Sequence, residues 1–220
     1  MTKYYFRIFQ FVVLISLMSS CNQKNNQTIE KSESQLNNQS IIKIINTNDS
    51  FLNRWVNYYK ENQRDFNIEK FIYLKTKQLN PINSSVFANY EKEFDSIYEN
   101  FLVYNPNKTK YLDFDSYHWF IDENGELGFS PDQEIDLANL IDKKIQRIDF
   151  RGPSQWVEDV FWDNNDTFIT LENSYDSIPF IIRYDLKEKQ VIIYQYQDTL
   201  NFQSQYVKER FKEKGLNYDL

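Results

Sequence analysis

Carboxylates are the most plentiful reactive groups in this chain of 220 residues. Asp113 and Asp115 lie two residues apart, so in a strand both side chains would point to one face. Such a pair can share a proton or bind a cation, as paired acids do in glycosidases. Glu158–Asp159 allows the same interpretation. Because the chain has 32 acidic residues, such spacings arise by chance, and we predict no catalytic pair and no metal site.

The other groups that commonly carry out catalysis are scarce. His118 is the only histidine, which excludes sites built from several histidines. The string "GFSPD" lacks the second glycine of a Gly-Xaa-Ser-Xaa-Gly elbow, and no glycine-rich phosphate loop occurs. We therefore predict that the protein is not an enzyme and needs no cofactor.

Aromatic residues make up 17% of the chain, and most of them must form its core. Tyr117, Trp119 and Trp156 stand beside turn sequences, where aromatic rings can form a stacking platform for a sugar or a protein partner. Together with His118, they are the candidate partner-binding residues. The competing interpretation gives them core or loop-anchoring roles, with His118 as a strand residue whose ring is hydrogen-bonded.

The N-terminus has the pattern of a secretory signal. Lys3 and Arg7 precede an apolar stretch over residues 8–18, which leads to Ser19 and Ser20 and then to Cys21. The apolar stretch is about half of the roughly 20 residues that a membrane-spanning helix needs. Cys21 is the only cysteine in the chain, and an unpaired thiol is unusual in an oxidising compartment.

The string "LMSSC" resembles the end of a bacterial lipoprotein signal. The resemblance covers the first 21 residues and departs from the commonest pattern at Met18, because Leu17 stands one position too early. It implies that residues 1–20 are a signal peptide and that Cys21 carries lipid, including palmitate. Several acyl chains then anchor the protein to a membrane without any further membrane element.

The residues after the cysteine bear on the compartment. In lipoproteins of this kind, an aspartate in that place can retain the protein at the inner membrane, and an acidic run can send it to the cell surface. Here Asn22 follows Cys21, and the first acid is Glu30. The resemblance therefore implies the outer membrane, with the domain facing the periplasm.

The charge of the mature chain limits its partners. Removal of residues 1–20 takes away Lys3 and Arg7 and no acid, which leaves 23 basic and 32 acidic residues. Such a chain has no electrostatic footprint for nucleic acid. Residues 21–40 contain Ile29 and Leu36 as their only apolar residues apart from Cys21, so we predict a disordered tether there.

Residues 41–100 have helical spacing of apolar residues. The string "NDSFLNRWVNYYKENQRDF" predicts a helix whose N-cap lies within residues 48–50. Weaker helical patterns run over residues 68–79 and residues 87–98. We therefore predict a helical segment before the strands.

Residues 101–200 read as short antiparallel strands separated by turns. Asn124–Gly125 between two apolar runs predicts a hairpin. The region also repeats, because residues 104–114 resemble residues 162–171, and residues 135–148 resemble residues 181–194 at an offset of 46. The two four-stranded units resemble two blades of a β-propeller, and a plain antiparallel meander remains the alternative.

The last element, within residues 201–220, has helical spacing and a stop signal at Gly215. The predicted fold is thus α+β, with N-terminal helices, antiparallel sheets and a C-terminal helix, and residues 41–220 form one globular domain. Residues 99–197 also loosely resemble uncharacterised bacterial lipoproteins, a resemblance that implies no activity.

These features together predict a membrane-tethered, non-enzymatic binding or interaction module of the bacterial cell envelope. One alternative is a lipoprotein that handles carbohydrate with an aromatic platform and acidic residues. The other is an inhibitor or immunity-type protein that blocks an envelope enzyme. The partner is accordingly a protein or a glycan, in addition to the membrane itself.

Overall fold

The computed structural model describes residue 45 and residues 47–216. The chain divides into two units, residues 1–39 and residues 40–220, and every described residue belongs to the second. The predicted signal peptide, Cys21 and the tether lie outside the described residues. Among the helices described, none has the length and apolar character needed to cross a membrane.

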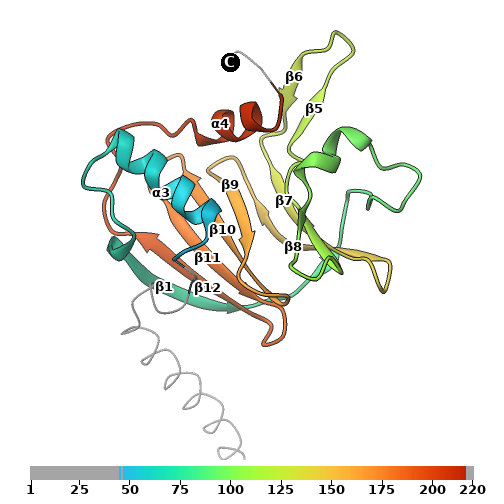
Figure 1. Cartoon of the computed structure of the whole chain (residues 1–220), viewed down its shortest axis with the longest axis horizontal. Helices are drawn as coiled ribbons and strands as arrows, with labels where there is room; N and C mark the ends of the chain where they lie inside the picture. The colour runs from blue at the N-terminus through green and yellow to red at the C-terminus, as the bar shows by residue number, and fades with distance from the viewer. Residues whose placement is uncertain (1–44, 46, 217–220) are drawn as a thin grey trace, which may run out of the picture. The chain divides into compact units, whose positions relative to one another are not determined.

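Most of the strands in the described part of the chain belong to two antiparallel sheets of five strands each (Figure 1). Sheet A has the order β1 (Phe71–Gln78), β12 (Gln190–Tyr196), β11 (Phe180–Asp185), β10 (Thr167–Ser174) and β9 (Gln155–Trp162). Sheet B has the order β2 (Ile82–Asn83), β8 (Lys144–Arg151), β7 (Gln133–Asn139), β4 (Lys110–Asp113) and β3 (Val103–Tyr104). The predicted hairpin, β5 (Trp119–Ile121) and β6 (Leu127–Phe129), stands between β4 and β7 in the sequence.

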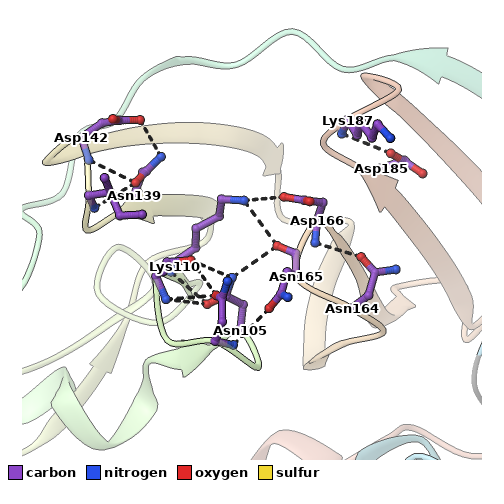
Figure 2. A network of polar contacts seen from close by, with 12 residues as sticks. Asn105, Lys110, Asn139, Asp142, Asn164, Asn165, Asp166, Asp185 and Lys187 are labelled. Carbon is purple, nitrogen blue, oxygen red and sulfur yellow. Dashed lines mark hydrogen bonds and ion pairs between the residues drawn. The ribbon is translucent and has the colours of Figure 1, made fainter.

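Two turns at equivalent positions of the predicted repeat have the same hydrogen bonds. In each unit an Asx side chain caps the third turn: Asn139 Oδ1 and Asp185 Oδ1 each accept from the amides two and three residues further on. Lys143 and Lys189 then adopt positive φ angles of 47° and 52°. Both pairs are separated by the offset of 46 seen in the sequence, so the two turns have the same construction (Figure 2).

The corresponding first turns of the two units contact each other (Figure 2). Lys110 Nζ donates to Asp166 Oδ1 at 2.5 Å, and Asn105 Nδ2 donates to the Asn165 carbonyl oxygen at 3.3 Å. Asn107 N donates to Asn165 Oδ1 at 3.0 Å. These contacts join sheets A and B at one end.

The described residues show no propeller. The two sheets instead share one core, and each carries a fifth strand from the segment before residue 84, because β1 pairs with β12 and β2 pairs with β8. The shared core consists of Leu79, Leu112, Phe114, Ile135, Ile148, Val157, Val160, Trp162, Phe168, Ile182, Tyr184, Val191 and Ile193. The segment from β1 to β2 therefore holds both sheets by main-chain hydrogen bonds.

The first predicted helix is confirmed as α3 (Ser50–Asn62). Asp49 caps it, since Oδ1 accepts from the amides of Phe51 and Leu52. Its buried side chains recur at helical spacing and are Leu52, Trp55, Val56 and Tyr59. This face lies against sheet A, where α3 contacts β9.

The rest of the predicted helical segment 41–100 is wrong. Residues 68–79 form a short 3₁₀ turn, η2 (Ile68–Lys70), followed by strand β1. Tertiary pairing with β12 decides the outcome, because it supplies backbone partners to a run rich in aromatic and β-branched residues. Residues 87–98 follow an irregular course into η3 (Ser96–Phe101), and Ala88 and Leu102 pack with Tyr111 of sheet B.

The predicted C-terminal helix is confirmed as α4 (Tyr206–Glu213). Gly215 ends it with a φ of +86°, the left-handed conformation that glycine adopts without strain. Helix α4 also contacts β9, so α3 and α4 both lie over sheet A (Figure 1).

Candidate functional site

A β-bulge in β9 gives the Glu158–Asp159 pair its orientation. Asp159 lies opposite Leu171, but Val157 lies opposite the next residue, Glu172, so Glu158 is the extra residue of the bulged strand. A bulge interrupts strict alternation. Consequently both carboxylates reach the helices that cover sheet A.

Glu158 joins three elements. Its Oε2 accepts from Trp55 Nε1 and from the Tyr59 hydroxyl, both at 2.7 Å, and its Oε1 accepts from Ser204 Oγ at 2.5 Å. The side chain is fully buried, and this burial raises the pKa of Glu158 above its ordinary value. Glu158 therefore fixes α3 and the segment before α4 to β9.

Asp159 makes charged contacts with the same two helices. Its Oδ2 accepts from Arg54 Nη2 at 2.5 Å and from the Tyr206 hydroxyl at 2.7 Å. Arg54 also pairs with Glu213 at the end of α4. Because a buried carboxylate needs such partners, the pair stabilises the packing of α3 beside α4.

Asp113 and Asp115 do not act as a pair. Asp113 Oδ1 caps the turn after β4, where it accepts from the amides of Asp115 and Ser116 at 3.0 Å. Asp115 instead binds both terminal nitrogens of Arg210 at 2.8 Å and accepts from Trp119 Nε1 at 3.1 Å. Over the described part of the chain, no group of three or more acidic, histidine or cysteine side chains is arranged to hold a metal ion.

The structure separates the four candidate partner-binding residues. Trp119 is only 1% exposed and lies in a core cluster with Tyr98, Phe101 and Phe211, so it is not a surface residue. Tyr117 is 37% exposed and lines one cleft. His118 and Trp156 line another cleft together, although they are 38 positions apart in the sequence.

The cleft that contains His118 and Trp156, here called the His118–Trp156 cleft, has a volume of about 330 Å³. It lies where β6, the start of β9 and the first turn of α4 meet. Much of its lining is apolar or aromatic and comes from Phe129, Pro131, Pro153, Trp156 and Val207.

Buried hydrogen bonds hold the polar residues of this cleft in place. Gln133 Nε2 donates to the Phe114 carbonyl oxygen at 2.8 Å, and Gln133 Oε1 accepts from the Val157 amide at 2.7 Å. Gln155 Nε2 donates to Glu172 Oε2 at 2.6 Å. Because internal hydrogen bonds hold Gln133 and Gln155 in place, the wall of the cleft is pre-formed. Most of the polar atoms of these two side chains are occupied, so the wall is rather apolar.

His118 contributes an uncharged acceptor. Its Nδ1 lies 3.3 Å from the Asp132 carbonyl oxygen, which can only accept, so we assign the ring proton to Nδ1. Burial lowers the pKa of His118 below its ordinary value, so the ring is neutral at pH 7. In this tautomer Nε2 is the acceptor of the ring, and Phe129 packs 5.5 Å from the ring centre.

Sequence reasoning missed Phe129, Pro131, Pro153 and Val207, because they come from three separate segments. The available signal was the pair of proline-containing turn strings, "GFSPD" and "RGPSQ", which both border the cleft. Comparisons of this chain with protein-family models, with curated proteins and with solved structures find no match.

Proposed function

We propose that the protein is a non-enzymatic, membrane-tethered binding module whose ligand lies in the His118–Trp156 cleft. The observation that carries the proposal is the cleft itself, with about 330 Å³ of space beside a half-buried tryptophan and a neutral histidine. Ligand sites commonly enclose roughly 300–1,000 Å³ and combine apolar walls with a few fixed polar groups.

The side chains that line the cleft indicate which kind of ligand it would bind. Phe129, Trp156 and Val207 offer apolar contact, and His118 offers an acceptor for a hydrogen-bond donor. The expected ligand is therefore neutral and largely apolar, with at least one N–H or O–H group. Because Gln133 and Gln155 are held by buried partners, little side-chain entropy is lost on binding.

A neutral naphthyl dye, N-phenyl-1-naphthylamine, tests this proposal as a probe of apolar clefts. The wild-type protein should enhance the dye's fluorescence, and Val207→Asp or Pro131→Asp should weaken its binding at least about tenfold, because a carboxylate would then face the apolar wall. The matched control is Ile141→Asp, a residue 73% exposed in the β7–β8 turn. Equal dye affinity in all three variants, with unchanged thermal unfolding, would contradict the proposal.

The tether is proposed to be a lipid anchor on Cys21, after removal of residues 1–20. The support is the position of the only cysteine directly after Ser19–Ser20. We further propose the outer membrane, with the domain in the periplasm, because Asn22 replaces the aspartate that retains such proteins at the inner membrane.

In a bacterial host, the wild-type chain should sediment with the outer membrane in a density gradient. Cys21→Ser should either release the protein into the soluble fraction or leave the precursor uncleaved. Ser20→Ala is the control, since it keeps a small residue before the cysteine. A Cys21→Ser protein that is processed and sediments like the wild type would rule out the lipid anchor.

A further inference from the structure

A second cleft lies beside the turn that follows β4. It has a volume of about 260 Å³ and lies between residues 85–98 and Ser116–Tyr117; here it is called the Tyr117 cleft. Four aromatic side chains line it: Phe87, Phe94, Tyr98 and Tyr117. Phe87 is 51% exposed, so a ring face there is open to a ligand.

The aromatic wall is held in place by its neighbours. The Tyr98 hydroxyl donates to the Trp119 carbonyl oxygen at 2.6 Å. The Tyr117 ring lies edge-on to Phe150, with 6.5 Å between the ring centres, and the Arg147 guanidinium lies 5.3 Å from the Phe150 ring centre. The rings of Tyr117 and Phe150 therefore extend the wall beyond the cleft itself.

Two serines of the cleft direct their hydroxyl hydrogens away from it, toward buried carboxylates. Ser85 Oγ donates to Glu134 Oε1 at 3.0 Å, and Ser116 Oγ donates to Asp113 Oδ2 at 2.5 Å. Both acceptors are buried carboxylates. A hydroxyl that donates to a carboxylate is polarised and offers its lone pairs to another donor. Both serines therefore act as acceptors toward the cleft.

The rim of the cleft is acidic. Glu93 and Asp95 line the cleft with exposed side chains. Asp113, which accepts from Ser116 of the cleft, lies directly across the strands from Asp136, whose Oδ1 has no hydrogen-bond partner among the described residues. The cleft is thus rich in acceptors, and the exposed carboxylates of Glu93 and Asp95 at its rim disfavour an anionic ligand.

We propose that the Tyr117 cleft is a saccharide-binding site for a neutral glycan. A pyranose ring combines an apolar C–H face, which packs on Phe87 or Tyr117, with many hydroxyl donors for the serine oxygens and the rim carboxylates. The volume lies just below the roughly 300 Å³ at which sites for drug-sized ligands begin, so it suits a single ring. The remainder of the glycan lies outside, over Tyr117 and Phe150.

Titration calorimetry and saturation-transfer NMR with neutral trisaccharides test this site. Maltotriose, cellotriose, mannotriose and tri-N-acetylchitotriose are the probes, and trigalacturonic acid is their anionic counterpart. At least one neutral trisaccharide should bind with a Kd between about 0.1 and 10 mM. Trigalacturonic acid should not bind in that range.

Variants then locate the binding. Tyr117→Ala and Phe87→Ala should each weaken the trisaccharide at least about tenfold, the effect of losing an aromatic contact together with its buried area. Tyr175→Ala is the matched control, because Tyr175 is 77% exposed and belongs to neither cleft. Both Phe87 and Tyr117 are surface residues, so thermal unfolding should stay close to that of the wild type.

Absence of binding by every neutral trisaccharide, or binding that survives both Tyr117→Ala and Phe87→Ala, would overturn the proposal. Tighter binding of trigalacturonic acid than of the neutral sugars would overturn it as well. The test is independent of the His118–Trp156 cleft, because Val207→Asp should leave trisaccharide affinity unchanged. The naphthyl dye likewise should not distinguish Tyr117→Ala from the wild type.

Discussion

Replacement of Arg210 by methionine is expected to lower the free energy of unfolding by about 3–5 kcal/mol, the usual cost of leaving one member of a buried ion pair unpaired. Arg210 and Asp115 are both buried, and two nitrogen–oxygen distances of 2.8 Å make the contact bidentate. The Arg210 guanidinium also lies 4.6 Å from the centre of the Phe114 ring and 4.8 Å from that of Phe211. Its removal therefore leaves a buried carboxylate and a gap in aromatic packing.

Urea denaturation of Arg210→Met, Asp115→Asn and the double variant measures this effect. The free energy of unfolding should fall in the double variant by much less than the sum of the two single decreases. Each single variant leaves one buried charge unpaired, whereas the double variant leaves none. Lys70→Met is the control: Lys70 pairs with Asp65 and Asp198 at the surface, where solvent screens the charges, so its loss should cost much less than the loss of Arg210. A loss at Arg210 no larger than at Lys70 would show that the ion pair does not stabilise the fold.

The same variant connects stability to the proposed ligand site. Helix α4 is only eight residues long, and helices that short are not stable in isolation. Its attachment depends on contacts such as that of Arg210, while Val207 of the same helix lines the His118–Trp156 cleft. The intact helix is thus a requirement for the shape of that cleft.

Much of the fold was predictable because its signals are local. The Asx-capped turns at Asn139 and Asp185, the Asn124–Gly125 hairpin and the apolar spacing of α3 each depend on neighbours within a few residues. The similarity of residues 135–148 to residues 181–194, at an offset of 46, predicts two related units from the sequence alone. Strand β1 was missed because its state depends on β12, more than 100 positions away in the sequence.

The buried carboxylates could not be predicted for the same reason. Asp115 finds its partner 95 positions later, and the donors to Glu158 from α3 lie about 100 positions earlier. The spacing of two acidic residues in the sequence gives no information about partners that lie so far away along the chain. The two clefts also combine distant segments, which explains why Tyr117, His118, Trp119 and Trp156 could be singled out but not grouped correctly.

The largest pH-dependent effect is expected at Asp136, in strand β7. This side chain is only 1% exposed, and Asp113, Glu134, Arg147 and Ser84 face it from the neighbouring strands and loop. The pKa of Asp136 is raised from 3.8 to about 8, mainly by burial. The negative charges of Glu134 and Asp113 act in the same direction, whereas the hydrogen bond with Ser84 and the charge of Arg147 oppose it. At neutral pH the folded protein therefore holds a proton that the unfolded chain releases.

This difference fixes the sign of the effect. Between pH 4 and pH 8 the folded state binds more protons than the unfolded state at this residue, so its contribution to stability falls as pH rises, by up to about 1.4 kcal/mol per pH unit. Asparagine resembles the protonated acid in shape and cannot ionise. Asp136→Asn should consequently gain stability over the wild type as the pH is raised from 5 to 8, and the difference should level off above about pH 8.

Urea denaturation of both proteins at several pH values measures the difference directly. Burial also raises the pKa of Asp113, which is present in both proteins, so the difference between them measures Asp136 together with its interaction with Asp113. Asp176→Asn, which replaces an exposed acid in the turn between β10 and β11 by its amide, is the control for the chemical change itself. A constant difference between Asp136→Asn and the wild type from pH 5 to pH 8 would mean that Asp136 ionises with its ordinary pKa. In that case Arg147, rather than a bound proton, would compensate the charge of Asp136.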